Sequence, residues 1–167
     1  MLRPSTGADV EAMVELQLAS WREGFVPILP PEFELPEPEG FTPRLAEALD
    51  AQGVRSTLAF VGHRLAGWIT YGQNRDPDAG PRTAEVRSLF VHPDHWRSGV
   101  GTTLMEEALT ELAADGFDEA TLWSFDVNDR ANAFYERQGF RRDGAGQRRE
   151  FSAGALEVRY RRGLTRM

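Results

Sequence analysis

The sequence of 167 residues contains no cysteine and no lysine. Without cysteine the chain can form no disulfide framework, no thiolate metal site and no cysteine nucleophile, which excludes several enzyme classes at once. Without lysine it cannot supply the Gly-Lys-Ser/Thr of a P-loop, so that phosphate-binding motif is excluded as well. All nineteen basic residues are arginine, a bias that we attribute to genomic base composition and not to a demand of the fold.

Long hydrophobic runs are also missing. No stretch approaches the roughly 18 to 20 consecutive apolar residues of a membrane span, and the first residues lack the basic-then-apolar order of a secretory signal. We therefore expect a cytoplasmic protein without a membrane partner. The net charge of -7 argues against nucleic acid as a partner, because phosphate binding needs a concentrated positive surface. The length and the 41% hydrophobic content predict one domain over residues 1–167, with a homodimer left open.

Turn signals and the spacing of apolar residues predict a chain of alternating strands and helices. The predicted elements are, in order, an edge strand at 2–4, a helix after Thr6 that ends near Gly24, an exposed proline-rich loop from Pro27 to Pro43, a short helix at about 43–51, a hairpin of strands 55–61 and 65–71, a strand at 83–91, a helix that begins near Gly99, a strand at 119–125, a helix at 128–138 and two strands at roughly 140–150 and 154–162.

The segment Val91 to Thr102 lies between a predicted strand and a predicted helix and carries two glycines, Gly99 and Gly101. Glycines let the backbone approach a ligand, and a helix start presents free N–H groups and partial positive charge, so this loop could hold a pyrophosphate. Arg97 would add a cation. Short glycine turns before helices are common, however, so this loop taken alone is about as consistent with a structural turn.

A second motif, Asn128 to Phe140, follows about thirty residues later. Asn128 and Tyr135 are seven positions apart, about two helical turns, so both can face one ligand. In isolation, each has a purely structural explanation, with Asn128 as a helix N-cap and Tyr135 as a core residue.

Together the two motifs resemble the GNAT superfamily of N-acetyltransferases. In that family a strand ending in a pattern like LFVHP precedes a Gln/Arg-x-x-Gly-x-Gly/Ala loop, and NxxAxxFYxxxGF follows. Here Trp96 stands at the Gln/Arg position and Arg97 is displaced by one. The resemblance implies an α/β (α+β type) fold with a mixed, mostly antiparallel, twisted sheet of about seven strands and about four helices, split near the fourth and fifth strands where acetyl-CoA enters.

His92 and His95 lack a convincing third ligand, so we expect no metal.

The resemblance also assigns roles. The residues implied to bind the cofactor are Leu89, Phe90, Val91, Arg97, Ser98, Gly99, Val100, Gly101, Thr102, Asn128 and Tyr135. In the family the strand before the glycine loop carries a bulge that leaves backbone N–H groups free, which makes the Leu89 N–H the expected oxyanion donor. Tyr135 is the expected acid for the departing sulfur. Glu85 lies four residues before Leu89, where some family members place a catalytic base, and the even spacing predicts that both share a sheet face. Alternatively Glu85 pairs with an arginine such as Arg87, and a water relay replaces it.

The acceptor is expected to bind near the first helix and the last strands. Trp21 and Phe25, together with Glu85, are the candidate substrate-binding residues, and the acidic stretch from Glu32 to Glu39 either attracts a cationic amine or is only a solvated loop. The sequence favours direct attack of a small-molecule primary amine in a ternary complex. Protein N-termini, another acyl-CoA, or a non-catalytic acyl-CoA-binding sensor remain as alternatives.

Overall fold

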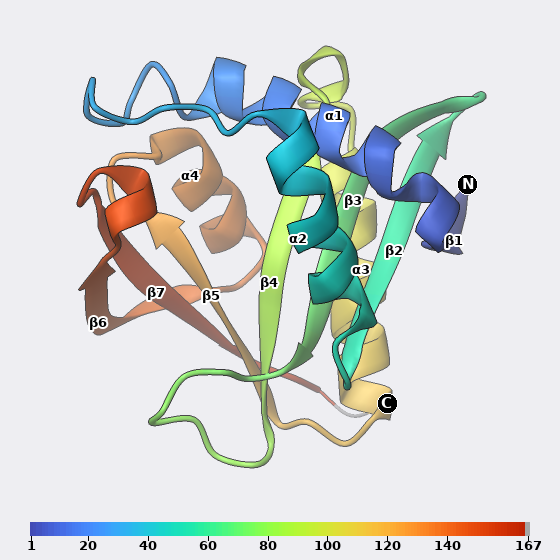
Figure 1. The fold of residues 1–167 in the computed structure, drawn as a ribbon. Helices are drawn as coiled ribbons and strands as arrows, with labels where there is room; N and C mark the ends of the chain where they lie inside the picture. The colour runs from blue at the N-terminus through green and yellow to red at the C-terminus, as the bar shows by residue number, and fades with distance from the viewer. Residues whose placement is uncertain (166–167) are drawn as a thin grey trace.

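The chain forms one twisted sheet of seven strands with the order β1-β2-β3-β4-β5-β7-β6 (Figure 1). The computed structural model describes residues 1–165. The strands are β1 (Leu2–Pro4), β2 (Val54–Val61), β3 (Arg64–Gln73), β4 (Thr83–Val91), β5 (Glu119–Phe125), β6 (Arg141–Arg148) and β7 (Leu156–Gly163). Every neighbouring pair is antiparallel except β4 and β5, which are parallel. The predicted mixed, mostly antiparallel sheet of seven strands is therefore confirmed.

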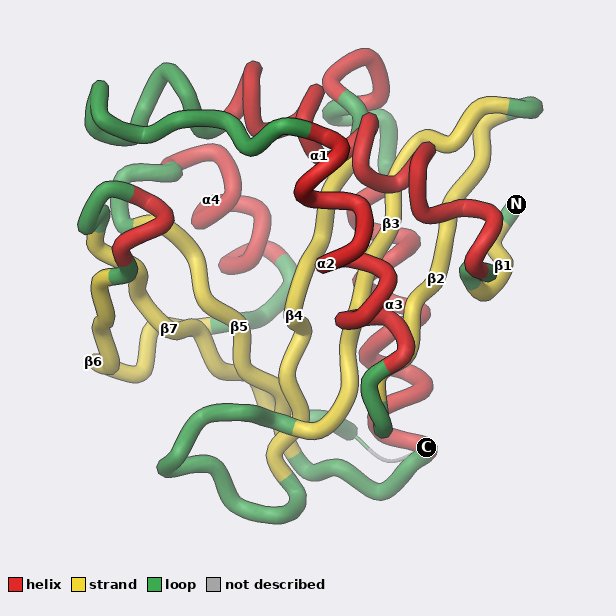
Figure 2. Tube along the Cα trace, viewed as in Figure 1, coloured by secondary structure: helices red, strands yellow, loops and turns green. Residues whose placement is uncertain are grey.

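Four α-helices cover the two faces of this sheet, as Figures 1 and 2 show. They are α1 (Val10–Gly24), α2 (Pro38–Asp50), α3 (Val100–Ala114) and α4 (Asp129–Arg137). Because side chains alternate along a strand, Trp68 of β3 packs in the core under α1 and α2, whereas its neighbour Ile69 packs in the core under α3. The indole Nε1 of Trp68 donates to the Met13 carbonyl of α1 over 3.0 Å, which anchors that helix to the sheet.

The helix α2 begins earlier than the sequence predicts. It starts at Pro38, within the stretch expected to be a proline-rich loop, and it contains Pro43. Proline is tolerated at the first helical position because its missing N–H has no helical acceptor there, and the fixed φ suits the helix. Thr42 Oγ1 also donates to the Pro38 carbonyl over 2.8 Å. The expectation of a loop up to residue 43 was therefore wrong for 38–43. None of the helices described within residues 1–165 has the length and apolar character to cross a bilayer.

Candidate active site

A slot opens between β4 and β5 where their pairing stops. The two strands pair only from Thr83↔Glu119 to Glu85↔Thr121. Beyond this point β4 remains paired with β3 as far as Val91, and β5 remains paired with β7 as far as Phe125. Beyond Glu85 the facing edges of β4 and β5 therefore do not pair with each other. This opening lies between the fourth and fifth strands, where the split of the sheet is predicted.

The backbone of Leu89 and Val91 points into this slot. His92 N–H donates to the Ala66 carbonyl of β3 over 2.8 Å. Because the direction of the backbone groups alternates along an antiparallel strand, the N–H groups of Val91 and Leu89 point away from β3. On that side the Val91 carbonyl accepts a hydrogen bond from Trp96 Nε1 over 2.8 Å. The geometry leaves the Leu89 N–H available to a ligand, as its predicted role as oxyanion donor requires.

A β-bulge in β4 overturns one expectation. Tyr71 pairs with Val86 and the adjacent Thr70 pairs with Ser88, so Arg87 is an extra residue. The extra residue shifts the alternation of side chains by one position. Leu89 therefore packs with Val86 in the core under α3, whereas Glu85 lies on the opposite face of the sheet. The expectation that Glu85 and Leu89 share a face was wrong.

The start of α3 supplies unpaired N–H groups beside the slot. Gly99 is the N-cap, with φ of 88°, and because glycine has no side chain it adds no capping hydrogen bond. The first hydrogen bond of α3 is donated by Thr103 N–H to the Gly99 carbonyl over 3.0 Å. The N–H groups of residues 100–102 therefore have no acceptor within the helix. Together with the helix dipole they make this end of α3 suited to an anion.

A single cavity of about 910 Å³ joins the slot and the start of α3. All the predicted site residues line it except Ser98 and Val100; those that do are Trp21, Phe25, Glu85, Leu89, Phe90, Val91, Arg97, Gly99, Gly101, Thr102, Asn128 and Tyr135. Six arginines but only three carboxylates line this cavity. This surplus is opposite in sign to the net charge of -7 of the whole chain, so the cavity is locally suited to a polyanionic ligand.

Arg130 is a site residue that the sequence did not single out. Its guanidinium lies 3.4 Å from the centre of the Trp96 ring. Partial burial lowers the pKa of Arg130, and the positive charge of nearby Arg97 lowers it further. Two cations that repel each other beside free N–H groups favour an anion between them. Trp96, at the position where the family has Gln or Arg, thus holds a cation supplied by α4. The signal in the sequence was only an arginine inside the second motif.

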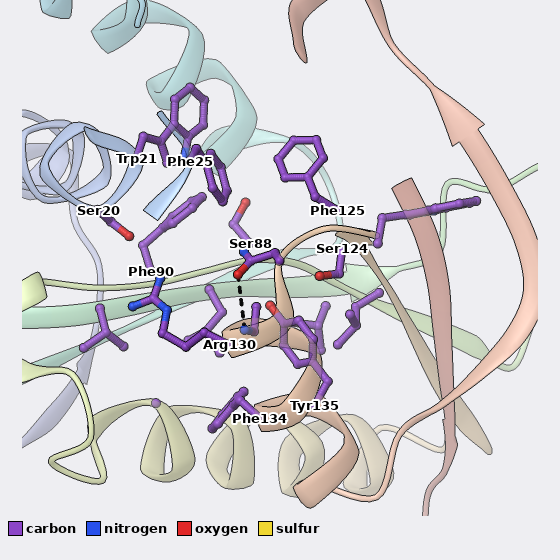
Figure 3. A pocket seen from close by; sticks show the side chains of 18 of the residues that line it. Ser20, Trp21, Phe25, Ser88, Phe90, Ser124, Phe125, Arg130, Phe134 and Tyr135 are labelled. Atoms are coloured by element: carbon purple, nitrogen blue, oxygen red, sulfur yellow. Dashed lines mark hydrogen bonds between the residues drawn. The ribbon is translucent and has the colours of Figure 1, made fainter. Parts of the chain in front are cut away.

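Asn128 and Tyr135 come from the two ends of α4. Asn128 is buried and its Oδ1 accepts from Ala131 N–H over 3.3 Å, so it is a helix N-cap that also lines the cavity. Burial raises the pKa of Tyr135 to about 12, so its hydroxyl keeps its proton at neutral pH. Figure 3 shows Tyr135, Phe134 and Ser124 among the residues that line the pocket. A protonated hydroxyl at this position can donate a proton or a hydrogen bond.

Glu85 is buried and bound by an arginine, although the partner is Arg75 and not Arg87. Arg75 Nε lies 2.9 Å from Glu85 Oε2, and Arg75 Nη2 lies 2.7 Å from Oε1. The Glu85 side chain is only 4% exposed. Since both carboxylate oxygens accept from the guanidinium, taking up a proton would weaken this pair. The sequence could not identify Arg75 because it lies in the loop between β3 and β4.

Aromatic side chains gather at the end of the cavity next to α1, which we name the aromatic end. It is formed by Trp21, Phe25, Phe90, Phe125 and Phe151. Figure 3 shows the first four of these rings around one space. The predicted pair Trp21 and Phe25 thus lies together, with ring centres 5.5 Å apart. The glutamates at 32, 34, 37 and 39 do not line this cavity.

If Arg130 holds an anionic ligand, Arg130→Met should weaken acetyl-CoA binding about tenfold, because a hydrogen bond to a charged group is lost. Isothermal titration calorimetry measures the Kd directly. Arg44→Met is the matched control, since Arg44 is an exposed residue of α2 outside the cavity and its loss changes the net charge equally. Equal Kd values for the two variants would exclude Arg130 from the phosphate site.

Comparison with known proteins agrees with this geometry. The model of the Acetyltransferase (GNAT) family matches residues 11–140. An uncharacterized N-acetyltransferase from Archaeoglobus fulgidus is 37% identical over 65 residues, which cover 39% of this chain and 44% of that protein. A mycothiol acetyltransferase from Saccharomonospora viridis is 31% identical over 106 residues, covering 64% of this chain and 31% of that protein. The chain thus spans less than half the length of these two relatives.

Solved structures show the same fold. The protein yncA from Salmonella typhimurium, solved with its cofactor acetyl-CoA, superposes with a TM-score of 0.75. The likeness covers 100% of this chain and 95% of that one at 18% sequence identity. At this identity the match concerns the arrangement of the strands and helices alone.

Proposed function

The chain belongs to the acetyltransferase (GNAT) family, and from that premise we propose that it transfers the acetyl group of acetyl-CoA to the primary amine of a small molecule. The observation that carries this proposal is the slot beside Leu89 and Val91. There, free backbone N–H groups, the uncapped start of α3 and a surplus of arginines line one cavity. A thioester joined to a nucleotide diphosphate needs these three features together, because it presents a carbonyl, a pantetheine arm and several phosphates.

The reaction that fits this geometry is direct attack within a ternary complex. The amine nitrogen forms a bond to the thioester carbon, and the oxygen that becomes negative accepts from the Leu89 N–H. The C–S bond then breaks, and the electron pair leaves with the sulfur, which receives a proton or hydrogen bond from Tyr135. The proton of the amine passes to water or Glu85. Because these 167 residues contain no cysteine, none of them can carry the acetyl group on a thiol.

The Glu85–Arg75 pair favours water as the base. Glu85→Gln should therefore lower kcat by less than about tenfold, because the bulk of the side chain and a hydrogen bond to Arg75 remain. If Glu85 itself removed the proton, the loss would be roughly 100-fold or more. Steady-state kinetics across pH 6 to 10 in wild type and variant separates these results, since loss of the base would also remove the acidic limb of the pH profile.

The proposed function is tested by two measurements on the whole chain. Calorimetry measures acetyl-CoA binding, and release of the CoA thiol is followed with a panel of amines. Binding accompanied by turnover supports the transferase. Tight binding without turnover over a broad panel would instead favour an acyl-CoA sensor, and competition with propionyl-CoA and succinyl-CoA tests the choice of acyl group. Absence of acetyl-CoA binding would contradict the proposal.

A further inference from the structure

Two buried polar groups of α1 lack partners at the aromatic end of the cavity. Gln17 and Trp21 are four residues apart, so they are neighbours on one face of the helix. Gln17 is 5% exposed and Trp21 is 7% exposed, and both line the cavity. Within residues 1–165 neither Gln17 Oε1 nor Trp21 Nε1 has a hydrogen-bond partner. Because buried polar groups are almost always hydrogen-bonded, these two groups leave hydrogen bonds to be made by whatever occupies the cavity.

A third unpaired group lies on the bulge of β4. Arg87 also lines the cavity, and its Nε is buried without a partner in the described part of the chain, although its Nη2 donates to the Gln73 carbonyl over 2.8 Å. Burial lowers the pKa of Arg87, and the nearby positive charge of Arg75 lowers it further. Burial and the charge of Arg75 both destabilise the charged form of Arg87. A carbonyl oxygen or a carboxylate at Nε would stabilise this form by accepting a hydrogen bond.

The two buried carboxylates of the cavity are, in contrast, already occupied. Glu85 accepts from Arg75 through both oxygens, and Glu157 accepts from Arg149 at 2.7 and 2.9 Å. The remaining carboxylate that lines the cavity, Asp129, is exposed in the first turn of α4. A polyamine needs free carboxylates for its additional ammonium groups. The aromatic end therefore fits an acceptor that is neutral or anionic apart from its reacting amine.

The rings of the aromatic end require an apolar group on the acceptor. Trp21 and Phe151 have ring centres 6.4 Å apart, and those of Phe25 and Phe125 lie 5.0 Å apart. Phe151 is 51% exposed, although it is one of the largest apolar side chains of the cavity. Covering this ring with an apolar part of a ligand would remove its surface from water.

We propose that the acceptor is an amine that also carries a carbonyl oxygen, as an amide or a carboxylate, and a bulky apolar group. This inference rests on the proposed function and specifies its acceptor. Trp21 Nε1 donates to the carbonyl oxygen, the Gln17 amide accepts from an N–H of the acceptor, and the rings hold the apolar group. Amino acids with large apolar side chains, and their amides, are the simplest compounds of this kind. A terminal carboxylate would additionally pair with Arg87.

Matched amines test this acceptor class. Phenylalaninamide and 2-phenylethylamine share the ring and the amine, and only the first has a carbonyl group. We expect kcat/KM for phenylalaninamide to exceed that for 2-phenylethylamine at least about tenfold, because without the carbonyl the buried groups remain unpaired. Spermidine should not react above background. Phenylalanine and a phenylalanyl dipeptide, assayed beside the amide, distinguish a free carboxylate from a peptide group as the source of the carbonyl.

Two variants connect the preference to the unpaired groups. Trp21→Phe keeps an aromatic ring and removes the N–H, and Gln17→Met keeps the length and removes the amide. Each should reduce the ratio of the two kcat/KM values at least about threefold relative to the wild-type ratio, a comparison in which the different basicity of the two amines cancels. Ser56→Ala is the matched control, because the Ser56 Oγ is also buried without a partner but lies outside the cavity, and it should keep the full ratio. A ratio taken within one variant is not affected by partial loss of folded protein.

Three results would overturn the inference. The first is that 2-phenylethylamine or spermidine reacts as well as phenylalaninamide, and the second is an unchanged ratio in both variants. The third is that calorimetry shows acetyl-CoA binding while none of the carbonyl-bearing amines is acetylated, which refutes the acceptor class and leaves the cofactor site intact. Failure of acetyl-CoA to bind would instead overturn the proposed function, and the inference with it.

Discussion

Tyr135→Phe should lower kcat by roughly 100-fold or more and leave the affinity for acetyl-CoA nearly unchanged. The change removes one oxygen from a side chain of α4 that lines the cavity. The ring remains to pack against Phe134 and Phe140, whose centres lie 5.5 and 6.4 Å away. The departing thiolate would then lose its proton donor, which raises the barrier for breaking the C–S bond without affecting the ground-state contacts of the cofactor.

Tyr160→Phe is the control for this experiment. Tyr160 is fully buried with its ring centre 6.0 Å from that of Tyr135, and it does not line the cavity. Its hydroxyl pairs with Arg142 Nε at 3.1 Å, so its loss should cost about 1 kcal/mol of folding stability and leave kcat unchanged. Equal kcat values for wild type and Tyr135→Phe would remove Tyr135 from the mechanism.

The pH profile gives a second check on Tyr135. Burial favours the neutral phenol and raises its pKa to about 12, so the proton is retained from low pH up to about pH 11. Below about pH 10 the kcat of the wild type should therefore not fall through ionisation of Tyr135. Any alkaline decline in this range should be present in Tyr135→Phe as well. A decline that Tyr135→Phe abolishes would show that the hydroxyl ionises in the working range. It would contradict the raised pKa and not the role, because an alkaline limb that disappears with the hydroxyl identifies that hydroxyl as the acid.

The elements that carry the cofactor slot could be predicted because their signals are local. A strand followed by glycines and then by an apolar helix periodicity is complete within residues 83–112, and the boundaries of β4 agree with the prediction. The second motif similarly fixes α4 to within one residue at each end. Prediction succeeded where the neighbouring residues determine the backbone conformation.

Features that depend on distant partners could not be predicted. The resemblance implies a bulge in the strand before the glycine loop, but its position at Arg87 is set by the register of β4 against β3. This register decides that Glu85 and Leu89 face opposite sides. The partner of Glu85 is likewise set by the path of a loop. Gln17 is polar on an otherwise apolar helix face, and only the packed structure shows that its Oε1 lacks a partner among residues 1–165. The spacing of apolar residues along a helix predicts which side chains are buried, but it does not predict which of them are hydrogen-bonded.

Gly101→Glu should abolish measurable acetyl-CoA binding and at the same time stabilise the fold. Gly101 is the second residue of α3, where glutamate has the better helix propensity by up to about 1 kcal/mol and also interacts favourably with the helix dipole. A Cβ at this position would meet only ordinary contacts, with Phe134 Cζ at 3.5 Å and Val91 Cγ2 at 3.6 Å. Neither packing nor propensity requires glycine here, so the approach of a ligand to the backbone is the remaining physical reason.

Measuring the Tm together with the Kd for acetyl-CoA distinguishes a blocked phosphate site from simple unfolding of the variant. We expect a Tm at or above that of the wild type, and a Kd for acetyl-CoA weaker by at least about 100-fold, since the carboxylate occupies the phosphate site and repels its charge. Gly101→Gln has the same bulk without the charge and should bind more tightly than the glutamate variant, by a factor that shrinks as salt is added. A folded Gly101→Glu with the Kd of the wild type would show that the phosphates do not lie against the start of α3, and the slot beside Leu89 would then no longer account for acetyl transfer.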